Sequence, residues 1–296
     1  MERTFTYIVG EEDAGKDIRT FLRARGYSRH ILASMKPVRD AVLVNGEHQY
    51  MRFPLSEGDV LCTKVRDTEP SVNVIPAPVP FDIAYEDEDL LVISKWADTA
   101  IHPAPGHPAN TLANGVALYF QQKGIPYVFR CINRLDRDTT GLLIVAKNIL
   151  SASVLETALQ KHEIRRTYLA VAEGLVPEEG TIFLPIARKE GSLIERCVDL
   201  QTGDRAVTHF RTIRHMEDRS LVELHLETGR THQIRVHMAA AGHPLMGDTL
   251  YNPDGIPGIG RQALHSARLD FVHPITGEQM HFESPLPEDM QALLQP

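Results

Sequence analysis

Hydrophobic and polar positions divide the chain into an early part with helical spacing and a later part rich in strands. Residues 16–25 carry apolar side chains on one helical face, and their arginines fall on the other faces. Gly26 predicts the end of this helix, and Ser28 predicts the N-cap of a second one. Short apolar runs at 41–44 and 60–65 predict strands. The early part therefore reads as two short helices with small strands.

After residue 80, runs with strand character dominate. The predicted strands are 81–85, 90–94, 142–147, 167–173, 207–213, 220–226 and 280–284. The predicted helices are 111–123, 150–161, 231–241 and a short turn near the C-terminus. Strands in succession with few helices, without strict alternation, indicate an α+β domain on a mostly antiparallel or mixed sheet.

A proline-rich segment separates the two parts. Four prolines fall within residues 70–80, which excludes a helix or a central strand and suits an extended tether. We therefore predict a small α+β domain at 1–66, a linker at 67–80 and a larger domain at 81–296.

Composition narrows the class of protein. The 296 residues are 43% hydrophobic and 24% charged, which is typical of a globular chain. The three cysteines lie far apart without a Cys-x-x-Cys pair, so we expect neither a disulfide framework nor a cysteine zinc site. The start lacks an apolar signal segment, and the longest apolar runs are too short to span a bilayer. We expect a cytoplasmic protein without a membrane partner, and a monomer by default.

The charge is unevenly distributed. The net charge is −8, yet residues 1–66 hold eleven Lys and Arg against nine Asp and Glu. Within residues 16–39, seven basic side chains face the single acid Asp17. Such a local surplus indicates a polyanionic partner better than the total does.

Two motifs suggest a nucleotide site and a metal site, but neither matches the full pattern that such a site requires. Residues 10–16 have the glycine and lysine spacing of a phosphate-binding loop, but Asp17 stands where Ser or Thr should reach magnesium. His232 and His237 are five residues apart, which is not the i, i+4 spacing of a helical zinc site. We predict no cofactor and no metal.

Two other segments carry candidate chemistry. In residues 133–141, two carboxylates, two arginines and two threonines crowd a turn before an apolar strand. Asp136 in this turn is either a reactive group held on a rigid strand or a cap for backbone amides, and local sequence leaves both open. Arg230 lies at the entrance of the helix predicted at 231–241, where it can pair with a carboxylate or a phosphate.

Together these segments resemble the RluA-type pseudouridine synthase family. The resemblance rests on Arg-Leu-Asp-x-x-Thr-Thr-Gly-Leu-Leu at 134–143, Arg-Thr-Tyr-Leu-Ala at 166–170, the block at 226–242 and the ending at 265–287. Residues 1–66 resemble the S4-like RNA-binding domain often fused to this family. Three positions depart from the family pattern: Asn133 replaces His, Arg166 replaces Lys, and 95–98 replaces a Lys-Pro-x-Gly turn.

The resemblance implies an isomerase that converts uridine to pseudouridine in structured RNA, large-subunit ribosomal RNA above all. It implies that Asp136 is the catalytic carboxylate, that Tyr168 stacks on the uracil, and that Arg230 holds Asp136 ionised through a salt bridge. It also suggests a set of RNA-binding side chains: Arg134, Arg137, Arg166, Arg19, Arg23, Arg29 and Lys36. The isomerisation oxidises nothing, in keeping with the prediction of no cofactor or metal.

Two other functions are compatible with parts of this sequence. A non-catalytic RNA-binding or ribosome-assembly factor on the same scaffold would have lost Asp136 or Arg230, and both are present. A glycoside hydrolase or nucleosidase would need a second carboxylate, for which Asp138 is the candidate by spacing.

Overall fold

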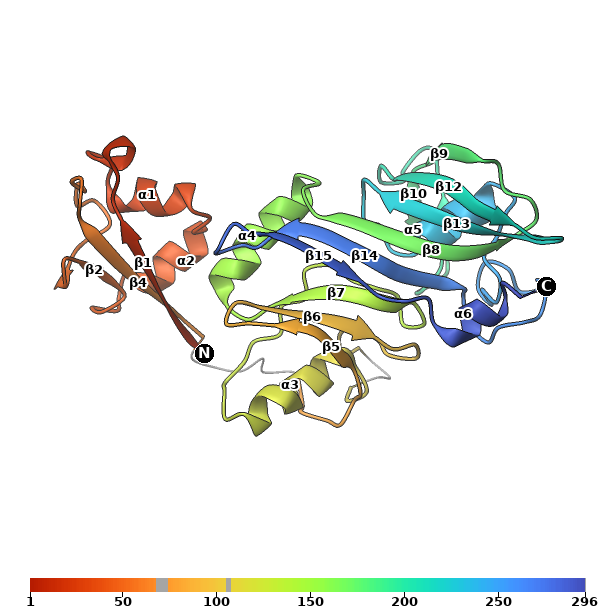
Figure 1. The fold of residues 1–296 in the computed structure, drawn as a ribbon, viewed down its shortest axis with the longest axis horizontal. Coiled ribbons are helices and arrows are strands. Elements are labelled where there is room, and N and C mark those ends of the chain that lie inside the picture. The colour runs from red at the N-terminus through yellow and green to blue at the C-terminus, as the bar shows by residue number, and fades with distance from the viewer. Residues whose placement is uncertain (68–73, 105–107, 296) are drawn as a thin grey trace.

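The computed structural model describes residues 1–67, 74–104 and 108–295. The first sheet is antiparallel, has the strand order β1-β4-β2-β3, and lies beside helices α1 and α2 (Figure 1). Its elements are β1 (Glu2–Ile8), the 3-10 turn η1 (Glu11–Asp13), α1 (Ile18–Ala24), α2 (Arg29–Met35), β2 (Val42–Val44), β3 (Glu47–His48) and β4 (Val60–Arg66).

Both helices begin at side-chain caps. The carboxylate of Asp17 accepts a hydrogen bond from the backbone N–H of Thr20 at 2.8 Å, so α1 starts at Ile18. The hydroxyl of Ser28 accepts from the N–H of Ile31 at 3.3 Å, which confirms the predicted N-cap of α2.

The basic side chains of this region divide into two groups. Lys16 and Arg25 pair with the buried Asp13, at 2.6 and 2.7 Å. The others have no ion pair with any acid among the described residues: Arg19, Arg23, Arg29, Lys36 and Arg39. The local surplus of positive charge therefore stays available on α1, α2 and the turn that follows.

The second sheet has nine strands, in the order β5-β6-β7-β14-β8-β13-β12-β9, with β15 paired to β14. Its strands are β5 (Asp82–Glu86), β6 (Leu90–Lys95), β7 (Thr140–Ala146), β8 (Arg165–Glu173), β9 (Glu179–Phe183), β12 (Val207–His215), β13 (Arg219–Leu226), β14 (Leu264–Val272) and β15 (Gln279–Glu283). β7 and β14 are parallel and every other pair is antiparallel. The expected α+β class with a mostly antiparallel, mixed sheet is confirmed.

Helices cover both faces of this sheet (Figure 1), and two further short strands pair only with each other in a small hairpin. The remaining elements are α3 (Leu112–Gln122), α4 (Ile149–Gln160), α5 (Gln233–Ala240), α6 (Glu288–Ala292) and the hairpin strands β10 (Ile186–Arg188) and β11 (Arg196–Val198). Alternate residues of β6 and β7 point to opposite faces: Leu91 and Leu143 pack with α3, whereas Leu90 and Leu142 pack with α4. Because both faces are buried, these strands read as continuous apolar runs.

Several elements were not predicted from the sequence. They are β1, β3, β9, the hairpin β10–β11 and the central strand β14. Residues 68–73 of the predicted linker lie outside the described residues, and 74–80 form neither helix nor strand.

The first sheet is docked onto the second through α4. Arg3 of β1 donates two hydrogen bonds to the buried carboxylate of Asp89, at 3.0 and 2.9 Å. The hydroxyl of Ser153 on α4 donates to the carbonyl of Gly26 at 2.8 Å. Leu150 of α4 is buried within the apolar core of the first sheet. The two parts thus share apolar contacts as well as charged ones.

Within the ranges that the structure describes, every helix is too short or too polar to cross a membrane.

Gly26 offers a test of this docking. Its φ is +88°, and a Cβ there would lie 2.4 Å from Cγ2 of Val154 on α4. Gly15 has a similar φ of +82° with open space around it. We expect Gly15→Ala to cost about 1–2 kcal/mol of backbone strain and Gly26→Ala to cost about 1–3 kcal/mol more, because the added methyl group must displace the side chain of Val154 on α4.

The midpoint of urea unfolding measures both variants. In the Val154→Ala background, the penalty of Gly26→Ala should fall toward that of Gly15→Ala. Equal penalties for the two glycines in the wild-type background would show that this face of the first sheet does not pack on α4.

Candidate active site

A cavity of about 770 Å³ opens where the turn before β7 meets β8 and the turn before α5. It brings together six of the residues predicted for the site: Asp136, Tyr168, Arg134, Arg137, Arg166 and Arg230. Segments that are far apart in the sequence therefore converge at one cavity. The four basic residues predicted in the early part, Arg19, Arg23, Arg29 and Lys36, lie on α1 and α2 or immediately beside them and do not line this cavity.

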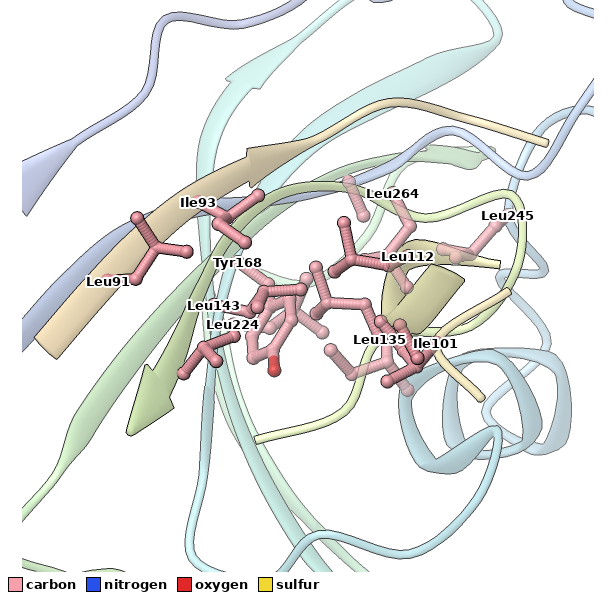
Figure 2. Close-up of a cluster of buried hydrophobic side chains, with 14 of the residues drawn as sticks. Leu91, Ile93, Ile101, Leu112, Leu135, Leu143, Tyr168, Leu224, Leu245 and Leu264 are labelled. Carbon is pink, nitrogen blue, oxygen red and sulfur yellow. The ribbon is translucent and has the colours of Figure 1, made fainter. Parts of the chain in front are cut away.

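The turn that carries Asp136 is anchored on both sides. The buried side chain of Asn133 accepts a hydrogen bond from the N–H of Ile144 in β7 at 2.9 Å. Leu135 is buried in the same apolar cluster as Tyr168 and Leu143 (Figure 2). Because Leu135 faces inward, the next residue, Asp136, lies at the rim of the cluster, and its side chain is 22% exposed.

Two buried cations hold the backbone just after Asp136. The ammonium of Lys95, at the end of β6, donates to the carbonyls of Trp96 and Arg137, both at 2.7 Å. Arg261 donates to the carbonyl of Asp138 at 3.1 Å. These bonds restrict the turn, which is the rigidity that a reactive side chain requires.

Arg235 connects Asp136 to the interior. Its Nη1 lies 3.4 Å from Oδ2 of Asp136. Its Nε and Nη2 donate to the two carboxylate oxygens of Asp248, each at 2.7 Å. Asp248 is fully buried, and the N–H groups of Leu250 and Tyr251 donate to it at 3.1 Å. One bidentate pair thus orients the guanidinium, and the remaining nitrogen faces Asp136.

Arg230 does not make the contact that was expected of it. The backbone N–H of Arg230 donates to the side chain of Gln233 at 3.0 Å, and α5 begins only at that glutamine. The guanidinium of Arg230 points away from Asp136, to the carbonyl of Arg205 at 3.1 Å and to Asp204 at 3.4 Å. The prediction of an Arg230–Asp136 salt bridge is wrong, because the turn directs Arg230 outward while α5 directs Arg235 inward.

Tyr168 and Arg166 form an apolar and a cationic wall of the cavity. Tyr168 lies on β8 among buried leucines, and burial raises the pKa of its phenol, so the hydroxyl stays protonated at neutral pH (Figure 2). Arg166 is 9% exposed, and its buried Nε has no hydrogen-bond partner among the described residues. A buried guanidinium N–H with no protein acceptor is suited to a ligand oxygen.

His232 lines the cavity immediately before α5. It precedes the helix with a left-handed φ of 58°, and its Nδ1 is 2.8 Å from the hydroxyl of Tyr251. Burial lowers the pKa of His232, although Asp136 acts in the opposite direction. The imidazole is therefore neutral at pH 7 and adds no charge to the site.

The remaining predicted contacts are more exposed. Arg134 lies at the mouth of the cavity, and Arg137 pairs with Asp98 at the surface. Asp138, the candidate second carboxylate, accepts a hydrogen bond from the N–H of Asp98 at 3.2 Å and does not line the cavity.

Within the described ranges no three His, Cys, Asp or Glu side chains converge as metal ligands do. The absence of a metal requirement stays a prediction.

Arg235 and Asp248 were not predicted from the sequence as residues of the site. Arg235 lies within the quoted segment 226–238, but it was not distinguished from Arg230. Arg235 could have been recognised by its position inside the helix: residues 233–238 are all buried in the structure, and a buried arginine needs a charged partner. Nothing in the sequence near Asp248 indicates that it supplies that partner.

The chain is similar in sequence to known RNA pseudouridine synthases. The family model for RNA pseudouridylate synthase matches residues 89–240. The chain is 42% identical over 278 residues to the uncharacterized RNA pseudouridine synthase YjbO of Bacillus subtilis, covering 94% of this chain and 98% of the relative. It is 38% identical over 279 residues to ribosomal large subunit pseudouridine synthase D of Neisseria meningitidis, covering 90% and 74%.

A solved structure shares the fold. Human RNA pseudouridylate synthase domain containing 1 superposes with a TM-score of 0.57 at 27% identity, covering 74% of this chain and 86% of the human one. The matched residues 89–240 of the family model include the turn of Asp136, Tyr168 and Arg235.

Because Lys95 is buried, we expect the free energy of unfolding to depend on pH. Burial lowers its pKa to about 7, while Asp138 and Asp136 oppose the shift. In the unfolded chain its pKa is about 10.4, so between pH 7 and 10 the unfolded state binds more protons than the folded state. We expect the free energy of unfolding of the wild type, relative to that of Lys95→Met, to rise over this range by up to about 1.4 kcal/mol per pH unit.

Urea unfolding of both proteins at pH 6, 7.5 and 9 measures this difference, in which other titrating groups cancel. Below about pH 6 the difference should be flat, because the lysine is then charged in both states. A difference that stays constant up to pH 9 would show that the buried ammonium keeps its proton.

Proposed function

The chain belongs to the RNA pseudouridylate synthase family and is an isomerase acting on RNA, and from that premise we propose that it modifies large-subunit ribosomal RNA with Asp136 as its catalytic carboxylate. The observation that carries the residue assignment is the carboxylate of Asp136, which lines the cavity 3.4 Å from the buried Arg235. The substrate assignment is supported by a relative whose name specifies the ribosomal large subunit.

The reaction exchanges one bond to the ribose for another. The bond between N1 of uracil and C1′ breaks, the base rotates, and a bond between C5 and C1′ forms. C5 then loses a proton and N1 gains one, so the product is an isomer of the substrate. Asp136 acts either as a nucleophile toward the ribose or as a base, and both roles need the ionised carboxylate.

The surroundings of Asp136 suit that requirement. The side chain of Arg235 is 8% exposed, and its guanidinium stabilises negative charge in a region shielded from water. Asp248 takes up two of its nitrogens, so the arginine is held in place before any substrate arrives. The ionised carboxylate is therefore stabilised by a preorganised partner.

The cavity also suits an extruded base. A uridine in folded RNA must leave its stack to reach Asp136, at a cost of about a few kcal/mol. Stacking on the ring of Tyr168 can recover about 1–3 kcal/mol of this cost. Arg166 offers an unpaired N–H to a polar atom of the nucleotide.

We assign the first 66 residues to RNA binding, as an S4-like domain. Four side chains there, Arg19, Arg23, Arg29 and Lys36, have no acidic partner among the described residues and can contact phosphates without reading sequence. Docking onto α4 would hold them in a constant position relative to the cavity, so recognition of RNA shape would be shared between the two parts.

Release of tritium tests the proposal. Large-subunit ribosomal RNA transcribed with uridine tritiated at C5 must lose label when pseudouridine forms. We expect release by the wild type, and a decrease of at least about three orders of magnitude for Asp136→Asn, which keeps the shape of the side chain but removes its charge.

Asp138→Asn is the matched control. The amide oxygen can still accept from the N–H of Asp98, so activity should stay within a few-fold of the wild type. Loss of activity in Asp138→Asn alone would instead favour a two-carboxylate mechanism. Tight binding of this RNA without any release by the wild type would indicate a binding factor.

A further inference from the structure

A second cavity, of about 430 Å³, lies between the β10–β11 hairpin and the turn before α5. Four arginines line it: Arg134 before β7, Arg188 and Arg196 on the hairpin, and Arg230. Asp204 is the only acidic residue of the lining among the described residues. The cavity therefore has a strong surplus of positive charge.

The protein neutralises little of this charge. Asp204 lies 3.4 Å from Arg230 and is 70% exposed, so the pair is screened by water. Arg196 donates to two backbone carbonyls near the hairpin tip, at 3.2 and 3.4 Å. Arg134 and Arg188 have no ion pair in the part of the chain that the structure describes. Like charges gathered in this way repel one another unless an anion lies between them.

The second cavity continues the first. Arg134, Gly229, Arg230 and Thr231 line both. A nucleic-acid strand whose base enters the first cavity must place its backbone near these shared residues. The anion that the structure favours here is thus a phosphodiester of that strand rather than a separate small molecule.

The hairpin is attached to α5 and to the turn before it through hydrogen bonds and apolar contacts. Arg188 and Arg196 face each other across the β10–β11 pair. The backbone N–H of Arg196 donates to the hydroxyl of Tyr251 at 2.8 Å, and the same hydroxyl lies 2.8 Å from Nδ1 of His232. Val236 of α5 packs in the small apolar cluster beneath the hairpin. Anchored on α5, the arginines can position an anion relative to Asp136.

We propose that this pocket binds one backbone phosphate next to the nucleotide being isomerised. The inference rests on the proposed RNA substrate and adds a subsite to it. Guanidinium groups bind phosphate oxygens in a bidentate manner, which fixes geometry as well as adding affinity. Arg230 is then a substrate anchor, which gives a role to the arginine that does not reach Asp136.

Salt dependence tests the subsite. KM in the tritium-release assay and Kd by filter binding are measured for the same ribosomal RNA over a range of KCl concentrations. We expect Arg188→Ala, Arg196→Ala and Arg230→Ala each to raise KM and Kd several-fold while kcat changes less than about threefold. Each should also reduce the slope of log Kd against log salt by about 0.7–0.9, the share of one phosphate.

A double variant sharpens the test. If Arg188 and Arg196 share one phosphate, Arg188→Ala/Arg196→Ala should lose no more slope than either single variant. A loss twice as large would mean that they bind separate phosphates and would overturn the single subsite. The control is Arg214→Ala on β12, an exposed arginine outside both cavities, which should keep the KM, Kd and slope of the wild type.

The remaining outcomes separate this proposal from the proposed function. If the wild type binds the RNA but releases no tritium, the assigned reaction on this RNA fails, and the slopes of Kd still decide the subsite. Unchanged slopes in all three single variants would overturn the subsite. A thermal-unfolding measurement identifies the alternative ligand. If the slopes are unchanged and inorganic phosphate raises the Tm of the wild type while chloride at equal ionic strength does not, the pocket holds free phosphate and the RNA subsite is overturned.

Discussion

The site depends on how one buried guanidinium is divided between two carboxylates. Asp248 is fully buried and accepts from two nitrogens of Arg235, which leaves the third to face Asp136 at the cavity rim. A buried arginine without partners would be strongly destabilising, and a buried carboxylate likewise, so Arg235 and Asp248 require each other. Because Asp248 completes this pair inside the protein, the charge of Arg235 is oriented before RNA binds. Asp136 then gains an electrostatic partner that needs no rearrangement during the reaction.

The sheet supplies the geometry that this arrangement needs. β7 runs parallel to β14 at the point where the turn of Asp136 enters the sheet, and Thr140 there hydrogen bonds the ring of His265 at 2.8 Å. Gly141 has a φ of +103°, and a Cβ at this position would lie 2.2 Å from the carbonyl oxygen of Ser266. Only glycine permits such a close approach. Lys95 then holds the turn from the other side, so the carboxylate of Asp136 is placed by the centre of the fold rather than by a free loop.

The sequence predicted most of what depends on local pattern and little of what depends on distant contacts. β6 and β7 were predicted because both are long apolar runs, and the turn of Asp136 was found through its position before β7. β14 was missed because His265 and Ser266 interrupt its apolar pattern, although pairing with β7 and β8 buries both. Arg230 and Arg235 are equally plausible partners in the sequence. Their roles are decided by where α5 begins and by Asp248, which no local pattern connects to Asp136.

The most direct test compares kcat for Arg235→Lys and Arg230→Lys at saturating RNA. A lysine at 235 keeps one positive charge but cannot engage Asp248 with two nitrogens and Asp136 with a third. The account predicts that Arg235→Lys lowers kcat by about 100-fold or more, whereas Arg230→Lys changes kcat by less than about threefold at this RNA concentration. A large loss of kcat in Arg230→Lys with near-normal turnover in Arg235→Lys would contradict the account.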